Sequence, residues 1–278
     1  MLVCSLWLQT IFYANTSDTI YINSGQFTCI DGNSMSYRAF NNAPSFSQKN
    51  AQLHVGVGDT LFLTVVNNDT VEHGFEISES VGLTDTLQPN DTILVKFYSN
   101  QQAVHCYYDH LNYPDNKNVG LAGLISVSNS ANRFYWNVKD HQLAWNDSIA
   151  NGGTVTWSDY YPDYYTINGA SNPDVNLDST ARVTGAVGDT LLIFVMNTGQ
   201  AEHSLHFHGY HCTIKYSNVH PNWVGRSKDT FPFKKMEGYV LELIPDQVGE
   251  FPMHDHNLLS ITAGGNYPFG MFLTILIQ

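Results

Sequence analysis

The stretch Ala186-Val-Gly-Asp-Thr-Leu-Leu-Ile-Phe-Val-Met-Asn197, followed by Glu202-His203, has a counterpart earlier in the chain. The counterpart reads Val57-Gly-Asp-Thr-Leu-Phe-Leu-Thr-Val-Val-Asn67, followed by Glu72-His73. Gly-Asp-Thr, the Asn and the Glu-His pair all recur at one offset of 130 residues. Agreement at so many positions indicates that the chain contains two copies of one module.

Each copy consists of short apolar runs bounded by Gly, Asn, Asp and Pro, and no long amphipathic helix is evident. This pattern predicts an all-β protein made of two tandem Greek-key β-sandwich or barrel domains. We expect the first domain at 20–130, a linker at 131–160 and the second domain at 161–278.

Composition excludes one class of partner. The chain has 278 residues and a net charge of −13, and no basic stripe interrupts the acidic balance. Because nucleic-acid affinity depends on neutralising phosphates with Lys and Arg, we expect no nucleic-acid partner.

Residues 1–14 contain an apolar run, Leu2–Ala14, that is too short to span a membrane. The run resembles the hydrophobic part of a secretory signal, and the alternative is a first buried strand. We therefore expect a secreted or periplasmic protein with no membrane span. The three cysteines beyond this segment suggest one disulfide, possible for Cys29–Cys212, and one thiol kept for chemistry at Cys106.

Histidines concentrate in two segments of the second copy, His203-Ser-Leu-His-Phe-His-Gly-Tyr-His211 and His254-Asp-His256. In a strand, residues i and i+2 point to the same face, so His206/His208 and His254/His256 form two same-face pairs. Imidazoles so placed suit copper, zinc, iron or nickel. We expect half of an interface metal site here, with His211 as an additional or outer ligand.

The first copy contains a different ligand set. His73, Cys106 and His110 supply two imidazoles and a thiolate, which is the trigonal set of a blue-copper site. Leu121 is expected at the weak axial position. The alternative is a buried free cysteine with two histidines that serve packing.

The two copies also end alike. Aligning these ends pairs His105 with His254 and Cys106 with Asp255. Neighbouring strand residues face opposite sides, so a metal at His105 would be joined to Cys106 by one peptide unit, a short path for an electron. Three other histidines, His54, His141 and His220, have no partner at ligand spacing and are expected to be ordinary surface residues.

These residues resemble the multicopper oxidase and copper nitrite reductase superfamily of cupredoxin repeats. His203-Ser-Leu-His-Phe-His-Gly209 is similar to the family's first histidine block, and His254-Asp-His256 to the block usually written His-Cys-His. The resemblance implies tandem cupredoxin-like domains, copper as cofactor, and a homotrimer with one copper centre between subunits. The ligands it implies are, for the type 1 copper, His73, Cys106 and His110, and for the interface centre, His105, His206, His208, His254 and His256.

The resemblance also implies an activity. Electrons from an unknown donor would pass from the type 1 copper to the histidine-bound centre and reduce oxygen or nitrite. Glu76, as a proton donor, and His208 are the expected catalytic residues. Two alternatives stay open: a non-enzymatic protein that carries electrons or buffers copper, and a purely structural secreted β-sandwich protein.

Overall fold

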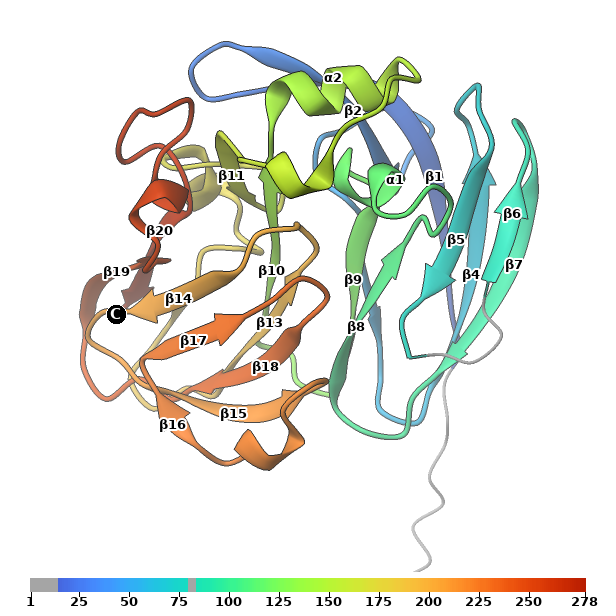
Figure 1. Ribbon diagram of the computed structural model, residues 1–278. Coiled ribbons are helices and arrows are strands. Elements are labelled where there is room, and N and C mark those ends of the chain that lie inside the picture. Colours follow the sequence, from blue (N-terminus) through green and yellow to red (C-terminus); the bar gives the residue numbers. More distant parts are fainter. Residues whose placement is uncertain (1–14, 80–83) are drawn as a thin grey trace, which may run out of the picture.

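A computed structural model describes residues 15–79 and 84–278, so the signal-like segment expected at 1–14 lies outside the described residues. The chain forms two β-sandwiches packed side by side, the first running from blue to green and the second from yellow-green to red (Figure 1). The prediction of an all-β protein with two tandem cupredoxin-like sandwiches is confirmed.

The first sandwich consists of two sheets, here called A and B. Sheet A has the strand order β2 (Ser34–Asn41), β1 (Asn15–Thr28), β4 (Thr60–Asn67) and β7 (Thr92–Tyr98). Sheet B has the order β3 (Gln52–Val55), β9 (Ala122–Val127), β8 (Ala103–Tyr108), β5 (His73–Ile77) and β6 (Thr84–Leu87).

The second sandwich consists of sheets C and D. Sheet C has the order β11 (Tyr164–Ile167), β10 (Arg133–His141), β13 (Leu191–Asn197), β18 (Gly238–Leu243), β15 (Cys212–Ser217) and β16 (Ser227–Lys228). Sheet D has the order β12 (Thr184–Gly185), β20 (Phe272–Ile277), β19 (Gly249–Asp255), β14 (His203–Phe207) and β17 (Thr230–Phe233).

The two sandwiches repeat one topology. β1 pairs with β4 in parallel, as β10 pairs with β13, and β3 pairs with β9 in parallel, as β12 pairs with β20. Sheet D therefore corresponds to sheet B strand by strand. Sheet C corresponds to sheet A, extended at one edge by β15 and β16. The duplication read from the sequence is a duplication of structure.

Burial explains why two equivalent strands differ in sequence. In β4 (TLFLTVVN) buried and half-buried residues alternate, because one face of sheet A lies open. In β13 (LLIFVMN) every residue is buried, because the outer face of sheet C packs against β8 and β9 of the first sandwich. The apolar cluster between the sandwiches includes Cys106, Leu124, Phe194 and Val240.

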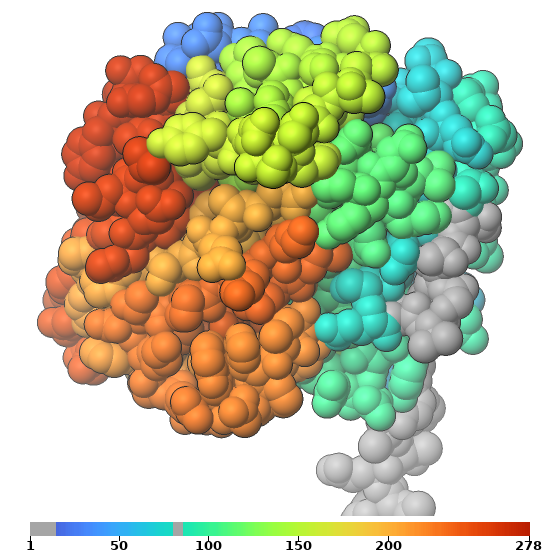
Figure 2. All heavy atoms as spheres, in the orientation of Figure 1, coloured from blue at the N-terminus to red at the C-terminus, as the bar shows by residue number. Residues whose placement is uncertain are grey.

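The segment expected to be a linker, 131–160, contains a central strand. β10 lies inside it and pairs with both β11 and β13, so the second sandwich begins at Arg133. The helix α2 (Leu143–Ala150) then crosses back and packs on β2 of the first sandwich. Figure 2 shows this yellow-green segment on top of the molecule, between the two halves.

The remaining helices are short. They are α1 (Asp115–Asn118) and the 3₁₀ turns Trp157–Asp159, Asp174–Leu177, Pro221–Trp223 and Leu258–Ile261. Among the described residues, no helix has the length and apolar character needed to cross a membrane.

Candidate metal centre

Four histidines form one patch on the outer side of sheet D, here called the histidine face: His206, His208, His254 and His256. β14 and β19 are antiparallel neighbours, and His206 lies directly opposite His254. The alternating residues Leu205, Phe207 and Met253 are buried in the core of the second sandwich. The strand period of two therefore directs the four imidazoles outward, as the sequence predicted.

The rings of the histidine face lie close together. The ring of His206 has its centroid 4.8 Å from that of His208, 5.7 Å from that of His254 and 5.5 Å from that of His256. His208 and His256 are exposed, whereas His206 and His254 are half-buried. A small molecule in solvent can therefore reach the centre of the patch.

Two of these histidines are held with Nε2 as the lone-pair nitrogen. Nδ1 of His254 lies 2.8 Å from the carbonyl oxygen of Asp255, which can only accept, so Nδ1 carries the proton. Nδ1 of His206 lies 2.9 Å from Oγ1 of Thr230, and that hydroxyl donates its own proton to Asp229. Nδ1 of His206 is therefore also a donor. Such outer hydrogen bonds orient histidine ligands in metal sites.

The histidine face fits a copper ion by its donor chemistry. Nε2 of His208 lies 2.9 Å from Nε2 of His254, a hydrogen-bond distance at which one ring donates to the other. Burial and the nearby His206 and His254 lower the pKa of His208, which favours the neutral form that binds metal. Within 15–79 and 84–278, no three His, Cys, Asp or Glu side chains already converge in metal-binding geometry.

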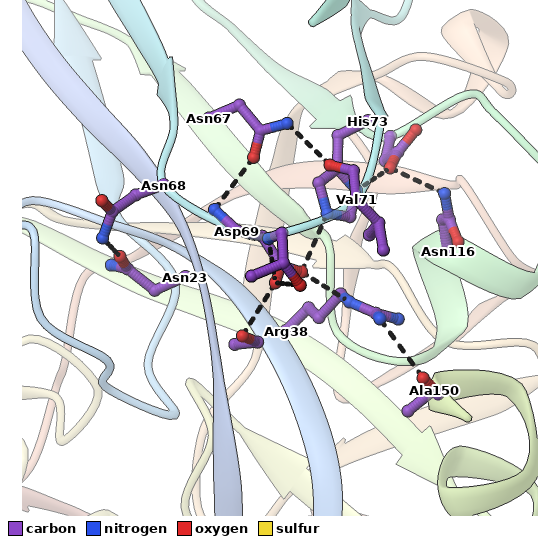
Figure 3. A network of polar contacts seen from close by, with 12 residues as sticks. Asn23, Arg38, Asn67, Asn68, Asp69, Val71, His73, Asn116 and Ala150 are labelled. Atoms are coloured by element: carbon purple, nitrogen blue, oxygen red, sulfur yellow. Dashed lines mark hydrogen bonds and ion pairs between the residues drawn. The ribbon is translucent and has the colours of Figure 1, made fainter. Parts of the chain in front are cut away.

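The structure does not bring together the ligands expected for type 1 copper. His73 is buried, and both of its ring nitrogens are engaged: Nδ1 lies 2.8 Å from Asp109 and Nε2 lies 3.0 Å from Asp69. Figure 3 shows this network, in which Arg38 and Asn116 also contact the two carboxylates. His73 therefore has no free lone pair for a metal.

The side chain of Cys106 lies in different surroundings from that of His73. Its side chain is buried in the apolar cluster between the sandwiches, and Sγ lies 3.6 Å from the carbonyl oxygen of Tyr107. Burial raises the pKa of this thiol to about 12, which opposes the thiolate that copper requires. Cys29 and Cys212 are buried free thiols too, so the disulfide considered for them does not form.

The other expected ligands of the first copy are also separated. His110 lies over Gly74, and Leu121 is fully buried, with its carbonyl oxygen bonded to the amide of Asp109. His105 packs beside Phe97, and Nδ1 lies 3.8 Å from a carboxylate oxygen of Glu79. The short path from Cys106 through His105 therefore joins no two assembled metal sites.

Strand register corrects the alignment of the two copies. In sheet B, Glu76 lies opposite Tyr108, as His206 lies opposite His254 in sheet D. The counterpart of His254 is therefore Tyr108, and not His105. By the same register, Asp109 corresponds to Asp255 and His110 to His256, three residues beyond the positions that the sequence alignment chose.

The corrected register reveals a carboxylate–histidine network in each sandwich. His203 is buried, with Nδ1 2.6 Å from Asp255 and Nε2 3.3 Å from Asp140. Sequence reasoning missed three of the four carboxylates that contact His73 and His203, namely Asp69, Asp109 and Asp140. The sequence does contain a signal for these networks: an Asp directly precedes both His110 and His256. The more conspicuous Cys106 obscures it.

The histidines outside these sites have structural surroundings. His141 is fully buried against the rings of Phe27 and Tyr37, so its placement at the surface was wrong. His54 is half-buried beside Ser126, and His220 stacks on Trp223 with a centroid distance of 4.0 Å. His211 is exposed and lies near Asp229, whose pKa is lowered by the hydrogen bond from Thr230 and by the charges of His206 and His211.

Comparison with known proteins agrees with this architecture. Residues 150–267 match the family described as Multicopper oxidase. The resemblance inferred from the sequence is confirmed. No curated protein matches the chain.

Solved structures share the fold over nearly the whole chain. The blue copper oxidase from Nitrosomonas europaea superposes with a TM-score of 0.78 at 21% identity, covering 95% of this chain and 86% of that one. The multicopper oxidase mgLAC gives 0.77 at 20% identity, covering 95% and 87%. The copper nitrite reductase from Nitrosomonas europaea gives 0.74 at 16% identity, covering 95% and 94%.

Proposed function

We propose that this chain is a copper-dependent oxidoreductase whose copper is held by the histidine face. The observation that supports this most directly is the placement of four imidazoles on adjacent strands, with Nε2 of His206 and His254 left as lone pairs. Copper bound there would supply a one-electron redox centre that binds and reduces a small acceptor, oxygen or nitrite.

The chain's own residues position this chemistry. Thr230 and the carbonyl of Asp255 fix the two inner rings, and exposed His208 can carry a proton between solvent and a bound acceptor. Asp255 accepts hydrogen bonds from the amides of Ser204 and Asn257, which holds β14 and β19 in the register that sets His206 opposite His254.

We propose that electrons enter by a different route from the relay expected from the sequence. Cys106 and His73 are not assembled, so we propose that an electron donor, unidentified in kind, delivers electrons directly to the exposed histidine face. An open site permits this, because His208 and His256 are both exposed. Reducing nitrite to nitric oxide consumes one electron and two protons, and reducing oxygen to water consumes four of each.

Two further parts of the proposal concern assembly and location. We propose a homotrimer in which the first sandwich of a neighbouring copy lies at one edge of the histidine face, leaves the rest of that face open to the electron donor, and brings Glu76 as a proton donor. In its own sandwich Glu76 occupies the position that His206 has in the second. We also propose export, which rests on the apolar run Leu2–Ala14.

A non-enzymatic copper protein is the second candidate, and the absence of an assembled thiolate site within the described part of the chain favours it. Such a protein would bind copper at the histidine face without turnover.

The experiment measures copper per chain and electron paramagnetic resonance spectra after loading, then oxygen uptake and nitric oxide release with a small reductant. Wild type is compared with His206→Ala/His254→Ala and with the control His220→Ala, whose ring stacks on Trp223. Copper loss confined to the double variant, with turnover in wild type, supports the oxidoreductase. Copper without turnover supports the second candidate, and equal copper in all three proteins contradicts both.

A further inference from the structure

Both sandwiches hold a buried histidine between two carboxylates at the end of the sheet pair. In the first, His73 connects Asp109, which follows β8 of sheet B, to Asp69, which follows β4 of sheet A. In the second, His203 connects Asp255 of sheet D to Asp140 of sheet C. The histidine thus joins the two sheets of each sandwich.

Hydrogen-bond accounting fixes the charge of His73. The carboxylate of Asp109 accepts hydrogen bonds from the backbone amides of Gly74 and Leu111 and from the side-chain amide of Asn116. The carboxylate of Asp69 accepts hydrogen bonds from the side chains of Arg38 and Ser24. Carboxylates saturated by donors carry no proton of their own. Both ring nitrogens that face them must therefore be donors, and only the imidazolium has two.

The same accounting applies to His203. The carboxylate of Asp140 accepts hydrogen bonds from the backbone amides of Gln200 and Ala201 and from the hydroxyl of Tyr160. Asp255 accepts the amides of Ser204 and Asn257. His203 is completely enclosed, and its two ring nitrogens again meet only acceptors.

The second carboxylate comes from a different backbone position in each copy. By the repeat, Asp69 corresponds to Gly199, and by strand pairing Asp140 corresponds to Ser24. A Cβ on Gly199 would collide with the carboxylate of Asp140, so the strand carboxylate fills the space that the loop carboxylate fills in the first copy. Carboxylates from two different backbone positions therefore place a negative charge at the same point of the fold in the two copies. This coincidence indicates that the charge is required there.

We infer that His73 and His203 are fixed imidazolium cations that replace copper at the position where a type 1 ion is expected, so that neither sandwich holds a type 1 site. Each cation performs the structural part of a metal's role, because it gathers anionic side chains from two sheets. The copper of this protein is then confined to the histidine face.

The first test uses the full-length protein labelled with ¹⁵N at histidine and follows the ring nitrogens by nuclear magnetic resonance at pH 8. We expect two of the twelve histidines to show both nitrogens protonated. His73→Gln and His203→Gln assign the two signals. Neutral rings at these positions would overturn the inference. The wild-type count decides the question even if a variant does not fold.

The second test adds cuprous ion, which is not paramagnetic, to the same sample. We expect the signals of the histidine face to shift and those of His73 and His203 to keep their two-proton pattern. Copper per chain should be the same in His73→Gln and wild type, and lower in His206→Ala/His254→Ala. Loss of copper on changing His73, or an intense thiolate-to-copper band in loaded wild type, would contradict the inference. If His206→Ala/His254→Ala keeps its copper while His73 and His203 keep two protons each, the proposed function and the confinement of copper to the histidine face both fail, whereas the assignment of two imidazolium cations stands.

Discussion

Tyr108 occupies in the first sandwich the position that His254 occupies in the second. Each is the residue directly before a buried Asp, Asp109 or Asp255. Tyr108 pairs across its sheet with Glu76, and His254 pairs with His206. The outer faces of two equivalent sheets therefore carry different side chains at matching positions, two imidazoles on sheet D and a carboxylate and a phenol on sheet B.

This equivalence predicts that metal binding can be transplanted. Glu76→His/Tyr108→His should raise copper content per chain, because opposite positions on antiparallel strands bring two imidazoles together. Copper content is measured beside the single variants. Equal copper in the double variant and wild type would show that register alone does not create the site.

Cys106→Ala should leave copper content and spectra unchanged. Burial raises the pKa of this thiol to about 12 and its surroundings are apolar, and both features oppose the thiolate that a copper ligand requires. Alkylation of the native protein at pH 8 should also be slow until the chain unfolds. A loss of absorbance or of copper in Cys106→Ala would restore the electron relay expected from the sequence.

Gly199→Ala should destabilise the protein severely. The added methyl group would displace the carboxylate of Asp140 and leave His203 with one partner. Breaking a buried ion pair costs about 3–5 kcal/mol. Urea unfolding measures the change. The control is Gly185→Ala, whose methyl would meet only side-chain atoms of Asp189 and Leu191 at 3.1 Å. Similar losses in both variants would contradict the proposed collision.

Stability should fall as pH rises from about 6.5 to about 9. Burial lowers the pKa of His203, but hydrogen bonds to Asp140 and Asp255 outweigh it and raise the pKa to about 9. A group whose pKa is higher in the folded state than in the unfolded state stabilises the folded state fully at a pH below the unfolded-state pKa. This stabilisation is lost as the pH rises through the folded-state pKa. For this shift the loss is on the order of 3 kcal/mol.

The measurement is thermal unfolding of the copper-free protein between pH 6 and pH 10, with His203→Gln as the comparison. The variant should show a weaker pH dependence over this window. Parallel curves for the two proteins would exclude His203 as the source.

The sequence predicted the fold well because the duplicated Gly-Asp-Thr stretches mark equivalent strands, β4 and β13. It also predicted the histidine face, since His206 and His254 obey the strand period of two. These features are local, and a period in one strand is readable without knowledge of its neighbours.

The contacts of the first copy are not readable from the sequence, for a physical reason. Residue type alone suggests copper ligands there, because Cys106 followed by His110 resembles a ligand pair in one dimension. The register between β5 and β8, which sets Glu76 opposite Tyr108, is a long-range property that no spacing within one strand contains. The carboxylates were missed for the same reason, because Asp140 reaches His203 from a strand 63 positions away.

The strand β10 has a consequence for dissecting the molecule. The family match begins at residue 150, after β10 has ended, yet β10 pairs with β13 in the middle of sheet C. A fragment cut at the matched boundary would expose the edge of β13, a run of seven apolar-rich residues, to any other chain in solution. The segment that matches the family is therefore shorter than the fragment needed to keep the second sandwich soluble, because that fragment must include β10.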